Sequence, residues 1–257
     1  MWPLFFYYIC TMIDSVRNTV LSIISKDNRG YITPMEFNLF AKQAQMEIFD
    51  GLMNKYSAAI NAQNARSYNA GYTDIPKKLT ETIELFSTYA ALQFNNTFAK
   101  FSTPINCYYL DKVLYNNTVE VEKVSHSKIH NLLASNIAAP TVSYPVYTMD
   151  RPSATGISDT FIQLYPLVLN STSQFGFVTA QYIRYPLDPV WTYSSLSNGD
   201  PVFNPNPAIG YQDFELSEAY EADLVLKILQ YAGVSIRESE VVQAAKTEEL
   251  QNIQEKG

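Results

Sequence analysis

The chain has 257 residues, of which 47% are hydrophobic and only 17% charged, and it holds 19 Tyr and 14 Phe against 2 Trp. Its net charge is −7, and residues 213–257 alone hold 10 acidic and 4 basic side chains, which argues against a basic nucleic-acid-binding face. The two cysteines, Cys10 and Cys107, are too few for a disulfide framework, so we expect two free thiols.

The low charge and the many tyrosines indicate a large neutral surface. Such a surface is often buried against another subunit, and tyrosine suits partly wet interfaces. Tyrosine is equally typical of β-strands, so both interpretations stay open.

The first segment, Met1–Thr11, is an apolar extension without charge. It is too short to span a bilayer, which takes about 20 residues, and it lacks the features of a signal peptide. We expect either an upstream extension, with Met12 as an alternative start, or a hydrophobic arm that packs on a neighbour.

Residues 12–107 are predicted to be the first half of a helical part. Apolar spacing predicts a helix over Met12–Ser25. A second helix begins at Thr33, where Thr33, Pro34 and Glu36 match a capping box with proline at the first helical position. Its apolar stripe is Phe37, Phe40, Ala41, Ala44, Ile48, Leu52, Tyr56 and Ile60. A third helix can open at Pro76, with Leu79, Ile83 and Phe86 facing inward.

Residues 108–212 are predicted to be a β-rich insertion. Runs rich in Val, Ile, Tyr, Phe and Thr predict strands at Tyr108–Leu114, Thr118–Lys123, Thr141–Thr148, Thr160–Leu169 and Phe175–Tyr185. Tyr-Pro recurs at residues 144, 165 and 185, a spacing typical of a meander, and each proline should mark a strand end or an edge strand. Val190–Ile209 is expected to be a long loop.

Residues 213–257 are predicted to complete the helical part. Ser217 can cap a helix that Gly233 ends, and a polar acidic helix is expected from Glu238 to Lys256, either docked on a partner or partly disordered. The expected fold class is therefore α+β, with helical N- and C-terminal segments forming one helical part around a β-rich insertion.

The sequence predicts no enzyme, and we assign no catalytic, cofactor-binding or metal-binding residue. No two of the nine glycines lie within ten residues of each other, so the glycine-rich phosphate-binding motifs are absent. His126 and His130 have the spacing of two zinc ligands on one helix face, but Ser127 breaks the protease motif. Glu120 and Glu122 share a strand face, as paired catalytic carboxylates would, but Val–Glu alternation is also usual in a half-exposed strand.

The turn Ser25–Glu36 partly matches a calcium-binding loop. Gly30, Ile32 and Glu36 fit its second half, whereas Ser25 and Arg29 stand where ligand oxygens are required. We therefore interpret the segment as a helix–turn–helix corner.

Three separated blocks of the chain resemble virion proteins of crAss-like and related podoviruses. The blocks are Leu21–Phe49, with its core at Gly30–Ala41; Tyr182–Trp191; and Asp213–Leu216 followed by Leu224–Val234. The resemblance implies an adaptor-type protein of the head-to-tail connector, assembled as a ring of about twelve copies and built from helices with a β-rich insertion.

We weigh three functional hypotheses. The first, which the resemblance implies, is a structural ring subunit of a tailed-phage virion that joins the portal and head to the tail. It would assemble in the bacterial host cytoplasm, contact the portal and other connector or tail proteins, let genomic DNA pass without specific binding, and involve no membrane. The second is a glycan- or receptor-binding tail module in which Trp191 and Tyr193 stack on a sugar. The third, a tail-associated hydrolase, has only the Glu and His pairs in its favour.

Overall fold

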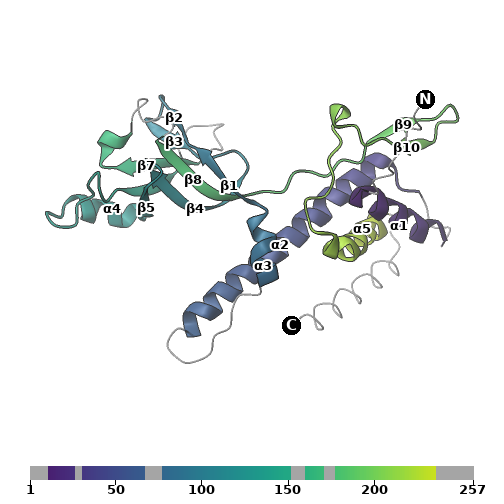
Figure 1. The fold of residues 1–257 in the computed structure, drawn as a ribbon, viewed down its shortest axis with the longest axis horizontal. Helices are drawn as coiled ribbons and strands as arrows, with labels where there is room; N and C mark the ends of the chain where they lie inside the picture. Colours follow the sequence, from purple (N-terminus) through teal and green to yellow (C-terminus); the bar gives the residue numbers. More distant parts are fainter. Residues whose placement is uncertain (1–10, 27–30, 67–76, 152–159, 171–176, 236–257) are drawn as a thin grey trace, which may run out of the picture. The chain divides into compact units, whose positions relative to one another are not determined.

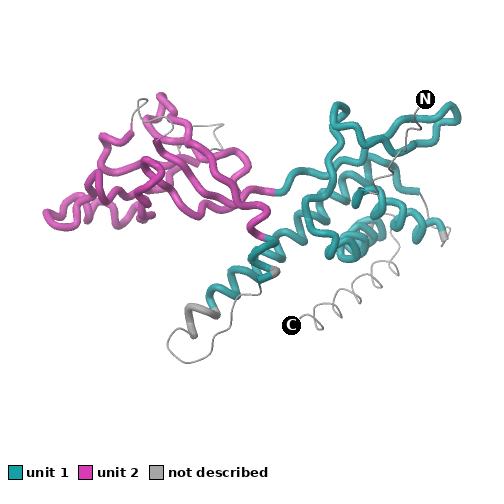
Figure 2. Tube along the Cα trace, viewed as in Figure 1, with its two compact units in different colours: residues 1–82, 186–257 teal, residues 83–185 magenta. Residues whose placement is uncertain are grey.

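The computed structural model describes residues 11–26, 31–66, 77–151, 160–170 and 177–235, and it has a mixed α and β fold. The chain divides into two compact units (Figure 2). Residues 83–185 form one unit, here called the sheet unit. Residues 1–82 and 186–257 contribute to the other, here called the helical unit.

These boundaries correct the predicted ones at both ends. The β-rich segment was expected at 108–212, but strands already begin at Ser87, and residues from Pro186 onward belong to the helical unit. The early strands were missed because they are only three to five residues long, so none of them contains the longer apolar run that identifies a strand in the sequence. They are β1 Ser87–Ala91, β2 Gln93–Asn95 and β3 Lys100–Ser102.

Within its described residues the helical unit is built on three long helices, in which α5 contacts both α1 and α2 (Figure 1). They are α1 Met12–Lys26, α2 Pro34–Arg66 and α5 Glu221–Ser235, while a shorter helix, α3 Lys77–Glu84, spans the unit boundary. Apolar spacing predicted α1 and α2 correctly. Gly233, by contrast, does not end α5, which continues to Ser235.

One apolar face of each helix is buried in this unit. The buried residues of α1 are Ile13, Val16, Val20 and Ile24; those of α2 are Phe37, Ala41, Ala44, Phe49, Leu52 and Met53; those of α5 are Leu224, Val225, Ile228, Leu229 and Ala232. The predicted stripe on α2 is thus partly confirmed. Tyr56 and Ile60, at its C-terminal end, are only half-buried.

The start of α2 has the predicted capping box. The backbone nitrogen of Thr33 donates to the Glu36 carboxylate at 2.9 Å, and the Glu36 nitrogen donates to the Thr33 hydroxyl at 3.2 Å. These bonds satisfy amide groups that have no partner inside the helix. The bond from the Thr33 nitrogen to the carboxylate, followed by a bond from the Thr33 hydroxyl at 2.8 Å, lowers the pKa of Glu36.

The sheet unit holds an eight-stranded sheet in the order β1-β8-β4-β5-β6-β7-β3-β2. The strands not yet given are β4 Cys107–Tyr115, β5 Val119–Lys123, β6 Val146–Asp150, β7 Phe161–Tyr165 and β8 Val178–Arg184. The two end strands, β1 and β2, are separated along the chain by Leu92 alone. Both ends of the sheet therefore meet at this residue, and we call the structure the rolled sheet.

The interior of the rolled sheet forms one core. Strands from all around the sheet contribute to it, which is the packing expected when a sheet curls on itself. Its buried residues are Leu92, Phe101, Leu110, Val113, Val121, Tyr147, Ile162, Leu164, Leu169, Val178, Ala180 and Tyr182.

The predicted meander is wrong, although its strand positions are close to the observed ones. β8 pairs with β1 and β4 rather than with β7, its predecessor in the chain. β5 and β6 are parallel, and helix α4 His126–Leu133 lies between them in the chain. The Tyr-Pro dipeptides do lie at strand ends, immediately before β6, at the end of β7 and immediately after β8.

Residues 190–212 contain more structure than the expected loop. Strands β9 Tyr193–Ser195 and β10 Pro201–Phe203 form an antiparallel hairpin, and the segment closes through an isolated bridge between Val190 and Gln212. The short 3-10 helices in the described part of the chain are η1 Leu167–Leu169, η3 Pro207–Ile209 and η4 Glu218–Tyr220. Ser217 caps η4 rather than α5. The predicted extension at residues 1–11, except Thr11, and the acidic helix at 238–256 lie outside the described residues.

Candidate functional site

Trp191 is the centre of the polar network in the helical unit. Its side chain is 2% exposed, and its indole nitrogen donates to the Asp14 carboxylate at 2.9 Å. The side chain of Asn38 contacts the Trp191 backbone twice, accepting from its nitrogen at 2.9 Å and donating to its carbonyl at 3.2 Å. Asp14 lies on α1 and Asn38 on α2, so Trp191 connects the two helices.

The faces of the Trp191 ring are covered by other side chains. The guanidinium carbon of Arg17 lies 3.8 Å from the ring centroid, and the rings of Tyr193 and Phe203 stack on it with centroids at 5.7 and 5.9 Å. Arg17 is 6% exposed, and its Nε has no hydrogen-bond partner in the described part of the chain. Burial lowers the pKa of Arg17, while the nearby Tyr31 and Asp14 partly oppose this change.

A row of polar side chains on α2 binds the segment that precedes Trp191. Lys42 forms an ion pair with Asp188 at 2.7 Å. The buried Gln45 donates to the Leu187 carbonyl at 2.7 Å and accepts from the Glu215 nitrogen at 3.0 Å. Lys42 and Gln45 continue the spacing of Asn38 along one helix face, so the segment lies against α2 over about two turns.

Asp213 connects the segment 213–215 to the start of α1. Its carboxylate accepts from the backbone nitrogens of Met12 and Ile13, at 3.1 and 2.8 Å, and so caps the first turn of the helix. We call Asp14, Arg17, Asn38, Trp191 and Asp213 the tryptophan hub. Residues from the three blocks that carry the sequence resemblance thus contact one another here or beside it.

The hub changes the interpretation of Trp191. The sequence suggested that Trp191 and Tyr193 could stack on a sugar, but the Trp191 ring is enclosed by protein side chains and only Tyr193, at 45% exposure, faces solvent. The signal missed in the sequence was the polar spacing on α1 and α2, which has meaning only once the partner segment is known.

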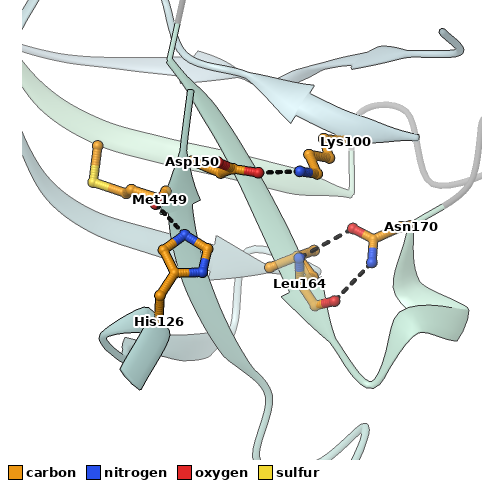
Figure 3. A network of polar contacts seen from close by, with 6 residues as sticks. All are labelled: Lys100, His126, Met149, Asp150, Leu164 and Asn170. Atoms are coloured by element: carbon orange, nitrogen blue, oxygen red, sulfur yellow. Dashed lines mark hydrogen bonds and ion pairs between the residues drawn. The ribbon is translucent and has the colours of Figure 1, made fainter. Parts of the chain in front are cut away.

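The two histidines lie on α4, as predicted, and one of them anchors that helix. The Nε2 atom of His126 lies 2.8 Å from the Met149 carbonyl on β6 (Figure 3). His130 is exposed. Within the described ranges, no group of three or more His, Cys, Asp or Glu side chains could hold a metal ion.

Two further polar contacts stabilise the strands beside His126 (Figure 3). Lys100 on β3 forms an ion pair with Asp150 on β6, and the bond from Lys100 lowers the pKa of Asp150 against the opposing effect of partial burial. The Asn170 side chain accepts from the Leu164 nitrogen at 3.0 Å and donates to the Leu164 carbonyl at 2.6 Å. It therefore satisfies both backbone groups of a buried residue beyond the point where β3 pairs with β7.

Glu120 and Glu122 are exposed on β5, while the residue between them, Val121, is 3% exposed. This is the half-exposed strand that the alternation predicted. Glu120 lies 3.7 Å from the ammonium of Lys112 on β4. The carboxylates thus lie on the solvent face of a strand.

The calcium-loop comparison is only partly testable, because residues 27–30 lie outside the described ranges. Its last position, Glu36, has its carboxylate bound to Thr33 in the capping box. Cys107, the described cysteine, is a free thiol whose pKa is raised by burial. Cys10 lies outside the described residues.

Two exposed surfaces combine apolar side chains with almost no charge. The first is the loop Ser135–Tyr144 after α4, here called the neutral loop, where Ile137, Val142 and Tyr144 are 98%, 50% and 81% exposed. The second is the hairpin Tyr193–Phe203, here called the neutral hairpin, where Tyr193, Leu196 and Val202 are 45%, 54% and 39% exposed. Contiguous exposed apolar surface is typical of interaction sites.

Neither a scan against models of known protein families nor a search of curated proteins finds a match for this chain. No helix in the described part of the chain combines the length and the apolar character that crossing a membrane requires.

Proposed function

We propose that this chain is a non-enzymatic structural subunit of a tailed-phage virion, in a ring of about twelve copies that joins the portal and head to the tail. The observation that carries the proposal is the pair of exposed neutral surfaces. Ile137 and Tyr144 of the neutral loop are 98% and 81% exposed, and a ring subunit would bury such apolar side chains between copies.

The tryptophan hub supports the same proposal. Its contacts join α1, α2 and the segments 186–191 and 213–215, so they favour a helical part formed from both the N- and C-terminal segments, with the sheet unit inserted between them in the chain. The resemblance in sequence implies this organisation for connector adaptors. In our proposal the helical part is the body of the ring.

The acidity of the chain fits a ring through which genomic DNA passes without specific binding. Residues 213–257 hold 10 acidic and 4 basic side chains, and a segment of this net charge repels phosphates instead of binding them. Portal and other connector or tail proteins are the proposed partners, in a virion assembled in the bacterial host cytoplasm. Neutralising Glu248, Glu249 and Glu255 should then alter particle assembly or DNA passage.

The test is an electron-microscopy reconstruction of the virion, combined with mass spectrometry of its proteins. We expect a closed ring of about twelve copies at the junction of head and tail, with the helical unit recognisable by its α2 helix of 33 residues. Absence of the chain from purified particles, or its presence only in a peripheral tail fibre, would contradict the proposal.

A further inference from the structure

Strand β1 has one edge without a pairing strand in the described part of the chain (Figure 1). Its other edge pairs with β8 in antiparallel register, and just beyond it the Leu92 nitrogen donates to the Val178 carbonyl at 2.9 Å. The bonds of an antiparallel ladder alternate along a strand, so the even-numbered residues of β1 are the ones that bond to β8. The backbone groups of Ser87, Tyr89 and Ala91 therefore point away from β8, and we call them the open edge.

The open edge lacks the features that protect free strand edges, which are charged residues, proline, a bulge or a covering segment. No charged residue or proline occurs from Leu85 to Ala99, and the register with β8 has no shift. Tyr89 is 66% exposed, and Ala91 is also exposed. The other strands that end a sheet in the described ranges, β2, β9 and β10, have three residues each, and Pro201 begins β10. Length and lack of protection thus distinguish β1 as the edge that can accept an added strand.

The chain itself contains a segment that suits the open edge. Such an edge is satisfied by an extended backbone, and aromatic and β-branched side chains favour that conformation. Residues 1–10 hold no charge, and Phe5–Ile9 is a run of five such side chains, the same length as β1. No other segment outside the described ranges has more than two aromatic or β-branched residues in succession. Residues 1–10 are therefore the best match in the sequence.

We propose that residues 1–10 of one copy pair with the open edge of the next copy. This inference rests on the proposed function, because a closed ring requires each subunit to present two different surfaces, here a donor segment and an acceptor edge. The donor starts from a fixed point, since the Asp213 carboxylate binds the nitrogens of Met12 and Ile13 at the beginning of α1. Ten extended residues span about 33 Å, which exceeds the length of about 22 Å of the 15-residue α1.

The first test compares the self-association of full-length chains by analytical ultracentrifugation. Ala91→Pro removes an N–H that points away from β8, so it blocks an added strand without removing a ladder bond, whereas Ala91→Val keeps that donor and is the matched control. We expect Ala91→Pro to weaken self-association by about tenfold or more, and Ala91→Val by less than about threefold. If Ala91→Pro does not fold, Tyr89→Lys takes its place, because a lysine on the open edge also opposes strand addition.

A chain that begins at Met12 tests the donor. Its self-association should weaken as much as that of Ala91→Pro, and combining the two changes should cause no further loss, because both remove the same contact. Cross-linking then identifies the copy that supplies the donor. Benzoylphenylalanine at position 89 is activated by light in a mixture of unlabelled and isotope-labelled chains, and we expect cross-links to residues 1–10 that join one chain of each kind.

Several results would overturn the inference. They are edge variants that associate like the wild type, an equal loss in Ala91→Val, a combined variant whose loss is the sum of the two, cross-links that never join different chains or never reach residues 1–10, or a wild-type chain that stays monomeric at its highest soluble concentration. None of these results contradicts a ring in the virion, which the reconstruction tests separately.

Discussion

The guanidinium of Arg17 lies over the indole ring of Trp191, with 3.8 Å between the guanidinium carbon and the ring centroid. Both side chains are buried, and Asp14 accepts the indole hydrogen bond from the same helix that carries Arg17. A cation held against an aromatic ring in a desolvated site contributes about 2 kcal/mol, but the cation needs a nearby negative charge to offset its burial. Asp14 supplies that charge.

We therefore expect Asp14→Ala to lower the free energy of unfolding by about 2 kcal/mol, since it leaves the indole donor without its acceptor and the buried cation without a nearby negative charge. Arg17→Met in the same chain should recover about 1 kcal/mol of this loss, because it removes the buried charge. The free energies of unfolding of the wild type, the two single variants and the double variant are measured by urea unfolding followed by Trp191 fluorescence, in a Trp2→Phe background. Strictly additive effects of the two substitutions would show that the residues are not coupled.

A second prediction concerns pH and the contact between α2 and α5. The Glu47 carboxylate accepts from the Lys227 ammonium at 2.7 Å and from the Tyr231 hydroxyl at 2.8 Å. Partial burial raises the pKa of Glu47, but these bonds outweigh it, and the pKa lies below the ordinary value of 4.5.

Because the folded-state pKa is depressed, the ionised carboxylate stabilises the fold at pH values above its unfolded pKa, and this contribution is lost as the pH falls through the folded pKa. Glu47→Gln should therefore reduce the free energy of unfolding by about 0.5–1 kcal/mol at neutral pH. The difference from wild type should shrink as the pH drops below about 4.5. Thermal unfolding at several pH values measures it, with Glu120→Gln on the exposed face of β5 as the control. If the wild type and Glu47→Gln still differ by the same free energy of unfolding at pH 3, the ionised Glu47 carboxylate is not the source of the difference.

The third prediction concerns Asn170, whose amide satisfies both backbone groups of the fully buried Leu164. Asn170→Ala leaves a buried donor and a buried acceptor without partners, which should lower the free energy of unfolding by about 2 kcal/mol. Asn131→Ala, at an exposed position on α4, is the control and should change it by less than about 0.5 kcal/mol. Equal denaturant midpoints for the two variants would show that the hydrogen bonds between Asn170 and the Leu164 backbone do not stabilise β7.

The fourth prediction concerns the attachment of α4. His126→Ala removes the contact with the Met149 carbonyl, worth about 1 kcal/mol, so the amides of α4 should exchange their hydrogens about fivefold faster. His130→Ala, four residues along the same helix at an exposed position, should leave the exchange rates nearly unchanged. Hydrogen–deuterium exchange with mass spectrometry resolves the two outcomes. Equal protection in both variants would show that the buried Ile129 alone holds the helix.

Local sequence signals predicted the elements whose causes are local. The apolar spacing of α1 and α2, the capping box at Thr33 and Glu36, and the alternation around Val121 each depend on residues close together in the chain. The mixed α and β class followed from the same signals. The strand pairing could not be predicted from these signals, because β8 lies between β1 and β4 and the two ends of the sheet meet at Leu92. Such pairing depends on contacts between residues that are distant in sequence.

Composition and spacing by themselves determined that the chain is acidic and sparsely charged, and that it lacks the glycine-rich phosphate-binding motifs. They also predicted the two N-terminal helices α1 and α2. Only the tertiary structure showed the environment of Trp191. From the sequence, this side chain could have stacked on a sugar. In the fold its ring is enclosed by Arg17, Tyr193 and Phe203. The physical reason is that burial is a property of the partners of a side chain. Those of Trp191 come from α1, α2 and the neutral hairpin, which meet only when the chain folds.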